Sequence, residues 1–399
     1  MDQVTRVTQQ GWGGRLGSSL KGILFGILMV FGGICLLFWG EGRAVKRAKA
    51  LDEGAGNVVT VAAAAPQSSD DGKLVHFTGS TEALESISDP LFGVETSALK
   101  LRRKVEFYQW TEHSKSEERK KLGGGTETIT TYSYEKEWSS GLISSSSFEQ
   151  SSGHENPSSK PFDSKTFKAD PIVIGDWILG SKFVDKLSRD ESLSVGHEQL
   201  ERASETVRSR LQLAGGGFYL GEDPNLSQVG DIRIHFSVVS QAEVSVVGQQ
   251  RGQNLQPYTA KVGGDIALLS YGSQSAEQMF DAAKAGNTTL AWVLRAVGFF
   301  VIMLGFSTIL RPLSVAADVV PFLGNLAEKG IGIAAFLFAA LVSLVTIAVG
   351  WIFYRPLLGI TMLAVAVGLI IWLVKRASAN PGAADKWTGQ APPPPPPLP

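Results

Sequence analysis

Three long apolar runs follow one another toward the carboxyl end of the chain. Leu290–Leu310 carries a single charge, Arg295, whereas Ile331–Phe353 and Leu357–Val374 carry none. A helix needs about 20 mostly apolar residues to cross a bilayer core of about 30 Å. A surface helix of a soluble protein would show a polar face every three or four residues, which these runs lack. The sequence therefore predicts three transmembrane helices.

A fourth apolar run, Gly22–Trp39, lies near the amino end and follows the polar segment Met1–Lys21. A cleaved signal peptide has a shorter apolar centre followed closely by small residues, whereas this run leads into a group of charges. We expect a retained transmembrane helix. The expected fold is a membrane protein with four transmembrane α-helices, one N-terminal and three C-terminal, plus a large inserted α+β extramembrane domain.

Small residues recur at helical spacing within these runs. In the first run glycines are spaced by four, seven and seven residues, which places them on one side of a helix. Small residues let membrane helices approach closely, although glycine and alanine are also simply common in such helices. We predict a tightly packed bundle that forms a homo-oligomer. The predicted packing residues are Gly22, Gly26, Gly33, Gly40, Ala335, Ala339 and Ser343.

The segment of residues 41–289 is long enough for one sizeable extramembrane domain. Periodicity predicts an amphipathic helix over His197–Leu213 and a second helix over Gln274–Ala285 that leads back into the membrane. The charged and then glycine-rich stretch Glu112–Gly125 is expected to join two strands as an exposed hairpin extension. The predicted strands are Val58–Ala65, Lys73–Thr78, Val105–Trp110, Thr126–Trp138 and Ile232–Val239.

Basic residues lie beside the apolar runs, where Lys and Arg contact lipid headgroups. One group of four follows the first run directly, and two further arginines lie near the ends of later runs. We expect all six to face the headgroups of membrane lipids. These residues are Arg43, Lys46, Arg47, Lys49, Arg295 and Arg355. Because the net charge is −1, we expect no nucleic-acid partner.

The residues that usually carry catalysis are sparse. Cys35 is the only cysteine and lies within the first apolar run, and no two histidines have the short spacing of a zinc protease. The glycine groups lack the lysine and hydroxyl pattern of a phosphate-binding loop. We therefore expect no enzyme, no metal and no cofactor.

The linkers and the tail have their own patterns. Arg311–Gly330 mixes apolar residues with prolines and charges, which suits a broken helix lying in the membrane interface. Tyr354–Pro356 is so short that the last two runs would form an antiparallel helical hairpin. The tail, residues 375–399, includes Pro392–Pro397 and is either a solvated spacer or a ligand for an aromatic groove of the SH3 kind.

Three separated stretches, Phe38–Gly54, Trp292–Gly298 and Gly350–Leu357, resemble signatures of the LUMA family and occur in the family's order. The resemblance implies cytosolic termini and one large luminal domain, in the endoplasmic reticulum and inner nuclear membrane of animals. In a bacterium the corresponding place would be the cell (inner) membrane, with a periplasmic domain. An even number of spans independently places both termini on one side.

These observations favour a non-enzymatic integral membrane scaffold that self-associates and helps organise membrane or envelope protein complexes, a role that the resemblance implies. Two alternatives stay open. One is an oligomeric channel or pore, although such proteins usually place ionisable residues within the membrane and the apolar runs offer only Arg295. The other is a receptor-like domain that binds a soluble partner.

Overall fold

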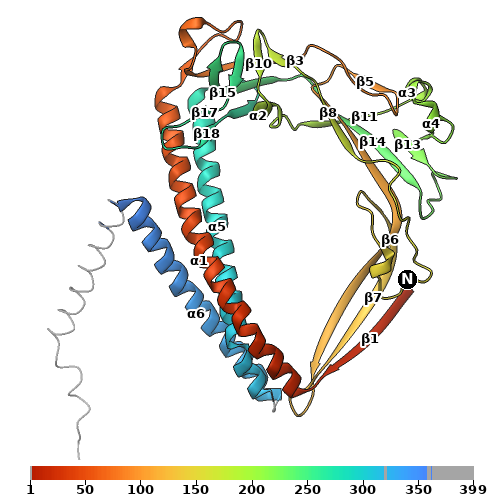
Figure 1. Cartoon of the computed structure of the whole chain (residues 1–399), viewed down its shortest axis with the longest axis vertical. Helices are drawn as coiled ribbons and strands as arrows, with labels where there is room; N and C mark the ends of the chain where they lie inside the picture. The colour runs from red at the N-terminus through yellow and green to blue at the C-terminus, as the bar shows by residue number, and fades with distance from the viewer. Residues whose placement is uncertain (1, 319–320, 357–360, 362–399) are drawn as a thin grey trace, which may run out of the picture.

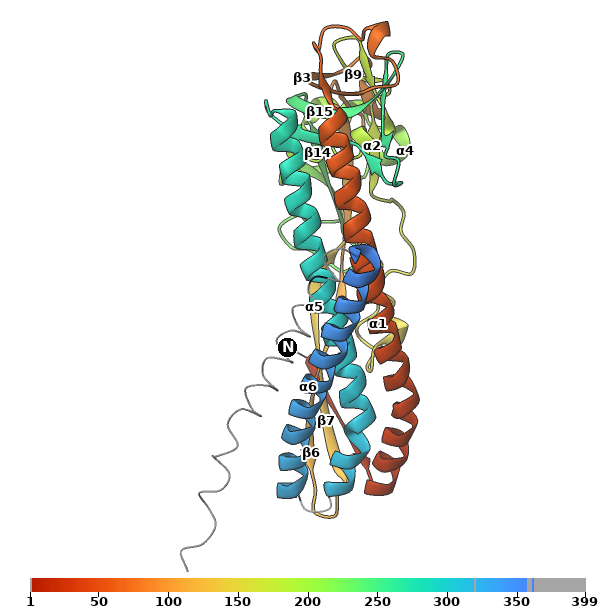
Figure 2. The same cartoon turned by 90° about the vertical axis from the view of Figure 1, so that its left-hand side faces the viewer.

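The computed structural model describes residues 2–318, 321–356 and 361 of the chain. The long helices form one layer, and the β-rich part lies opposite them. The two parts meet at both ends of the molecule and diverge between these ends (Figure 1). The helices lie side by side, with the long β-hairpin behind them (Figure 2). The predicted fourth span, Leu357–Val374, and the proline-rich tail lie outside the described residues, Thr361 excepted.

Among the described residues, three helices are long and apolar enough to cross a membrane. They are α1 (Trp12–Asn57), α5 (Ala276–Ala317) and α6 (Pro321–Tyr354). At 1.5 Å per residue α1 is about 70 Å long, more than twice the thickness of a bilayer core. It therefore continues well beyond the predicted span Gly22–Trp39. Large apolar side chains such as Phe25 and Phe31 stay exposed on α1, as expected for a surface that faces lipid.

The β-rich part contains an eight-stranded and a seven-stranded sheet. The first has the order β1 (Asp2–Gln10), β7 (Thr126–Ser139), β6 (Lys100–Lys120), β14 (Ile232–Val239), β13 (Gly217–Leu220) and β12 (Gln212–Ala214), with β11 (Asp190–Leu193) on β14 and β8 (Lys165–Lys168) on β6. The second has the order β19 (Leu268–Tyr271), β15 (Glu243–Arg251), β16 (Asn254–Gln256), β10 (Trp177–Leu179), β9 (Ile172–Ile174), β3 (Leu74–Ala83) and β2 (Val59–Thr60).

Smaller elements complete the domain. Two pairs of short strands are β4 (Ile87–Asp89) with β5 (Val94–Thr96) and β17 (Tyr258–Thr259) with β18 (Asp265–Ile266). The short helices are α2 (Ser181–Val184), α3 (His197–Arg202) and α4 (Glu205–Arg208), with 3-10 turns at Ser68–Asp70 and Ser145–Ser147.

The core of the domain lies between the two sheets. In β14 buried and half-buried residues alternate, because successive side chains of a strand point to opposite faces. Phe77 of β3 stacks on Trp177 of β10 with ring centroids 4.5 Å apart, and both are almost fully buried. Aromatic pairs of this kind bury large apolar areas and fix the spacing of the strands.

The long helices enter the domain instead of ending at its surface. Leu51 of α1 and Phe280 of α5 are buried in one apolar cluster with Ile266 of β18 and Val247 of β15. The capping box formed by Ser275 at the start of α5 satisfies the first free backbone N–H groups. The helices and the domain therefore share a packed core, and no flexible linker separates α1 or α5 from it.

The prediction of an α+β domain is confirmed only as a β-rich domain. Ile232–Val239 is a strand as predicted, and α5 begins within the predicted helix Gln274–Ala285. The single helix predicted over His197–Leu213 is only partly present: α3 and α4 lie within it, but the chain turns out of the helix at Ala203, and Gln212–Ala214 pairs with β13. Its apolar residues Val207 and Leu211 are buried in the core, so tertiary packing replaced the local helical preference.

The stretch Glu112–Gly125 joins two strands as expected, but most of it is itself strand. β6 continues to Lys120, and its pairing with β7 runs in register from Phe107 opposite Ser139 to Lys120 opposite Thr126. At about 3.4 Å per residue β6 is about 70 Å long, the same length as α1. The hairpin therefore reaches the far ends of the helices (Figure 1).

The amino-terminal segment has an unexpected place. Asp2–Gln10 forms β1, which pairs antiparallel with β7, from Asp2 opposite Tyr134 to Gln10 opposite Thr126. We predicted that Met1–Lys21 lies across the membrane from the extramembrane domain. The structure pairs part of this segment with the hairpin of that domain, and helix α1 begins two residues later, at Trp12.

Candidate functional site

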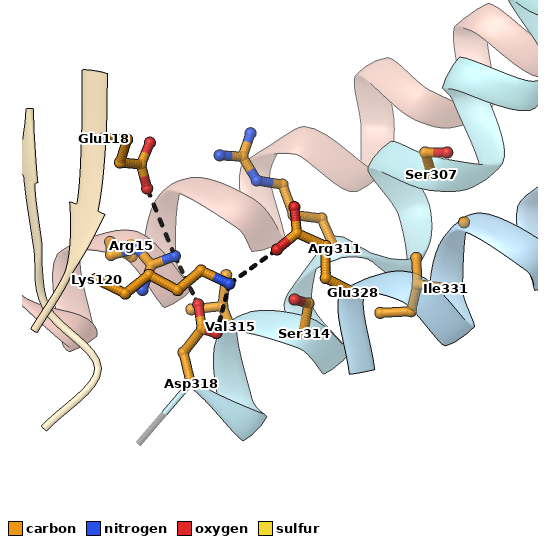
Figure 3. Close-up of a pocket in the computed structure, with 11 residues that line it drawn as sticks. Arg15, Glu118, Lys120, Ser307, Arg311, Ser314, Val315, Asp318, Glu328 and Ile331 are labelled. Carbon is orange, nitrogen blue, oxygen red and sulfur yellow. Dashed lines mark hydrogen bonds and ion pairs between the residues drawn. The ribbon is translucent and has the colours of Figure 1, made fainter. Parts of the chain in front are cut away.

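The hairpin and the helices meet in a charged cluster at their far ends (Figure 3). Arg15 of α1 donates to Asp318 at the end of α5 over 2.7 Å and to the carbonyl oxygen of Gly124 in the hairpin turn over 2.6 Å. Lys120 of β6 lies 3.0 Å from the other oxygen of Asp318 and 2.8 Å from Glu328 of α6. We name Arg15, Lys120, Asp318 and Glu328 the junction cluster.

The Arg15–Asp318 pair of the junction cluster is well shielded from water, whereas the side chain of Glu328 is 65% exposed. The side chain of Asp318 is 1% exposed and that of Arg15 is 8% exposed. Burial by itself would lower the pKa of Lys120, but hydrogen bonds to Glu328 and Asp318 raise it. Removing one partner from such a buried ion pair leaves an uncompensated charge, which costs about 3 to 5 kcal/mol. The cluster therefore ties the hairpin to α1 and α5 through the buried Asp318, and it reaches α6 through the more exposed Glu328.

Two further contacts support this junction. The indole N–H of Trp12 donates to the carbonyl oxygen of Val315 over 2.8 Å. Gly124 packs directly beneath the same indole, and its positive φ of 77° is one that residues with a side chain rarely adopt. The adjoining pocket of about 560 Å³ is lined by acidic and basic side chains together, including Glu118 and Arg311. This balance favours a structural joint over an anion-binding site.

A second polar contact joins the three helices nearer the domain. Glu41 of α1 accepts two hydrogen bonds from Arg295 of α5, at 2.6 and 3.0 Å, and one from the indole of Trp351 of α6, at 2.9 Å. The Arg295 guanidinium also lies over the ring of Trp292. Arg295, predicted to contact headgroups, is thus bonded inside the protein. Sequence reasoning missed Glu41, whose place directly after an apolar run was the available signal.

The four basic residues that follow the first predicted span lie around one groove of about 780 Å³. Its walls come from α1, the turn between β17 and β18, and the end of α6. We name this the basic groove, and its main lining residues are Trp39, Arg43, Lys46, Arg47, Lys49, Asp265, Phe353 and Tyr354. Arg355 lies instead in a neighbouring groove with Arg295. Headgroup contact by these residues stays a prediction.

The predicted packing residues of α1 face α5. A side chain at Gly26 would lie 2.7 Å from the carbonyl oxygen of Gly305, and one at Gly33 would lie 2.5 Å from Ile302. Gly22 and Gly40 lie at ordinary contact distance from Thr308 and Leu294, respectively. Close packing of these glycines is therefore within one chain.

The small residues of α6 are also covered. Ala335 and Ala339 are fully buried, and Ser343 is nearly so. Ala339 belongs to an apolar cluster with Leu37 of α1 and Ile302 of α5. Among the described residues, no group of three or more His, Cys, Asp or Glu side chains is placed to hold a metal ion.

The chain is similar over most of its length to known membrane proteins. A family model described as transmembrane protein 43 matches residues 107–356. Transmembrane protein 43 of Mus musculus is 35% identical over 89% of this chain and 90% of its own length. The Homo sapiens protein is 34% identical over 95% and 96%, and the Drosophila melanogaster homolog 30% identical over 88% and 94%.

No solved structure matches the chain. The family model and the relatives belong to the family that the three sequence signatures predicted, so the resemblance to the LUMA family is confirmed. With its long apolar helices and these relatives, the chain is a membrane protein and belongs to the transmembrane protein 43 family.

Proposed function

We propose that this protein is a non-enzymatic integral membrane scaffold that self-associates and helps organise membrane or envelope protein complexes. The observation that carries the proposal is the polar sheet β1–β7–β6, which extends over the same height as the apolar helices and is tied to their far ends by the junction cluster (Figures 1 and 2). From Thr111 to Lys120 every residue of β6 is polar, so neither face of this strand suits lipid.

A bilayer imposes a strict condition on this arrangement. Backbone and side-chain polar groups of a sheet cannot lie in hydrocarbon, because nothing there replaces their hydrogen bonds to water. If the helices span the membrane while the junction cluster is closed, the polar sheet must lie in water at the same depth. Several chains can provide such a place when their helices face outward to lipid and their sheets face inward to one another.

The free edge of the sheet supports contact between neighbouring chains. Within the described residues β1 pairs with β7 alone, so its other edge leaves backbone groups unpaired along nine residues. Long open edges are templates for pairing with a strand of another chain. The side chains of β1 are almost all exposed, and they include Thr5 and Val7 on the same face.

The shared core between helices and domain suits a scaffold. Because Leu51 and Phe280 are packed among strands of the domain, the domain is held in a fixed orientation to the helices. A domain held in this way presents its surface to other membrane or envelope proteins at a defined height. As places for this role we propose the endoplasmic reticulum and inner nuclear membrane, or the cell membrane in a bacterium.

The test is the particle mass of the full chain in lipid nanodiscs. We expect a defined oligomer, and a smaller mass after Thr5→Lys with Val7→Lys, since charges block pairing at a strand edge. The matched control is Leu84→Lys with Leu226→Lys, two exposed residues elsewhere in the domain, which should leave the mass unchanged. A wild-type particle containing one chain would refute the proposal.

A pore is the second candidate, favoured by the same polar sheet. Sheets that face one another in water at membrane depth would line a path across the bilayer. Release of a trapped dye from liposomes that contain the full chain tests this role. Dye release that stops when β1 carries Thr5→Lys and Val7→Lys would support a pore. If liposomes that contain an oligomer of confirmed mass retain the dye, only the scaffold role is supported.

A further inference from the structure

The basic groove carries more positive charge than its surroundings neutralise. Among the described residues that line it, the one acidic residue is Asp265, whose carboxylate is bonded to Lys182 and, over 3.0 Å, to the Thr259 hydroxyl. In the described part of the chain, Lys46 and Lys49 have no hydrogen-bond or ion-pair partner, and both are exposed. The groove therefore holds two ammonium groups available to an anion.

The two arginines of the groove are held in place by neutral acceptors. Arg47 donates to the backbone carbonyl of Asp265 over 2.6 Å, and Arg43 donates to the side-chain oxygen of Asn287 over 3.2 Å. Asn287 is itself buried and bonded to the Ala44 carbonyl oxygen, which fixes that acceptor. Neither bond cancels the charge of a guanidinium, so both arginines add to the positive field of the groove.

The other side of the groove is aromatic and apolar. Trp39 is 58% exposed at the end of the first apolar run, and Phe353 is 70% exposed at the end of the run on α6. Tyr354 closes the groove beside Phe38, with ring centroids 5.2 Å apart. Aromatic residues at the ends of membrane helices lie at the level of the headgroups. The groove thus has a cationic side and an apolar side at the depth where the charged headgroup of a phospholipid joins its acyl chains.

We propose that the basic groove binds one anionic phospholipid. Its phosphate and acidic headgroup contact Lys46 and Lys49, in the positive field of Arg43 and Arg47. The glycerol end and the first acyl carbons pack against Trp39 and Phe353. A soluble phosphate would use only the cationic side, whereas the combination of both sides matches an amphipathic anion.

The experiment compares lipid retention by the full chain in phosphatidylcholine nanodiscs that contain a minor fraction of phosphatidylserine. Native mass spectrometry after release counts the bound phosphatidylserine. Each basic residue near an anionic surface is worth about fivefold in affinity, so Lys46→Gln with Lys49→Gln should lower binding by on the order of 30-fold. The control pair is Lys115→Gln with Lys186→Gln, exposed lysines of the domain that remove the same charge.

Three results would overturn the proposal. Equal losses in the groove pair and the control pair would mean attraction by overall charge. Full retention after the groove substitutions would mean that phosphatidylserine binds elsewhere. Displacement of the lipid by glycerophosphoserine or inorganic phosphate at matched concentration would mean a site for a soluble anion. Support requires selective loss in the groove pair and a further loss after Trp39→Ala, with no displacement by the soluble anions.

Discussion

The junction cluster should control whether the amino-terminal strand stays on the sheet, and Asp318→Asn tests this directly. The substitution removes a carboxylate that contacts both Arg15 and Lys120, at 2.7 and 3.0 Å. Loss of one partner of a buried pair costs about 3 to 5 kcal/mol, and we expect the lower end because an amide oxygen still accepts a hydrogen bond. Since β1 connects to α1 through Gly11 alone, opening of the junction should release β1 from β7.

The assay is hydrogen exchange of the β1 amides in detergent-solubilised protein. A loss of about 3 kcal/mol corresponds to exchange about a hundredfold faster in β1 and at the hairpin tip. Asp190→Asn is the control, because its pair with Arg102 is about one third exposed on both sides, 37% and 33%, and such surface pairs contribute about 0 to 1 kcal/mol. Exchange in β1 that stays within about threefold of wild type after Asp318→Asn would show that the junction cluster does not hold β1 on the sheet.

Three further predictions concern the helices and the domain. Gly26→Leu with Gly33→Leu should lower the unfolding temperature of the single chain, since overpacking costs about 1 to 3 kcal/mol per site, whereas Gly32→Leu, with nothing within 4 Å, should not. Glu41→Gln should destabilise the helix bundle by about 3 kcal/mol, because it leaves Arg295 without its carboxylate. A second change, Arg295→Gln, should recover part of this loss. An unchanged unfolding temperature after Glu41→Gln would contradict the pairing. Burial lowers the pKa of His76 and His235 from 6.5, so the folded state binds fewer protons than the unfolded state. The unfolding temperature should therefore fall as pH drops below about 6.5. A flat profile in that range, or one that stays the same after both histidines are replaced with glutamine, would refute this prediction.

The membrane helices could be predicted because their signal is local. Each apolar run depends only on consecutive residues, and the glycine spacing of α1 follows from the helical period. The partner of that glycine face was not predictable, since one helix sequence does not reveal which neighbour it packs on. Gly26 and Gly33 were expected to drive self-association, yet both lie against α5 of the same chain.

The contacts between distant residues of the candidate site could not be predicted from the sequence for a related reason. Arg15 and Asp318 are separated by 303 residues, and Glu41 and Arg295 by 254. Residue type and spacing give no information about a pair so far apart. Arg295 was therefore predicted to reach the headgroups, which is the usual place for a lone arginine near the end of a span. The basic group from Arg43 to Lys49 was recognisable because its members are close in sequence.

The strand β1 was not predicted because its position before a transmembrane helix outweighed its β-branched residues. Asp2–Gln10 contains the β-branched pairs Val4-Thr5 and Val7-Thr8, yet it precedes a predicted span and was placed across the membrane from the domain. Its pairing with β7 depends on a hairpin that is as long as α1. The charged stretch Glu112–Gly125 indicated an exposed hairpin extension between two strands, whereas most of it is itself strand, because β6 and β7 pair over 14 residue positions.

The proposed self-association depends on the pairing of β1 with β7 in lipid, and the junction cluster holds the same hairpin against the helices. Thr5 and Thr131 are directly opposite each other, so we would replace both with cysteine, together with Cys35→Ser, and oxidise the protein in nanodiscs. We expect an intramolecular disulfide in high yield, and none for Thr5→Cys with Ser188→Cys, because Ser188 is bonded to Tyr271 of β19 in the other sheet. If the Thr5–Thr131 pair stayed reduced in lipid while each cysteine reacted with a maleimide added from a different side of the membrane, β1 and β7 would lie on opposite sides of the bilayer and could not pair.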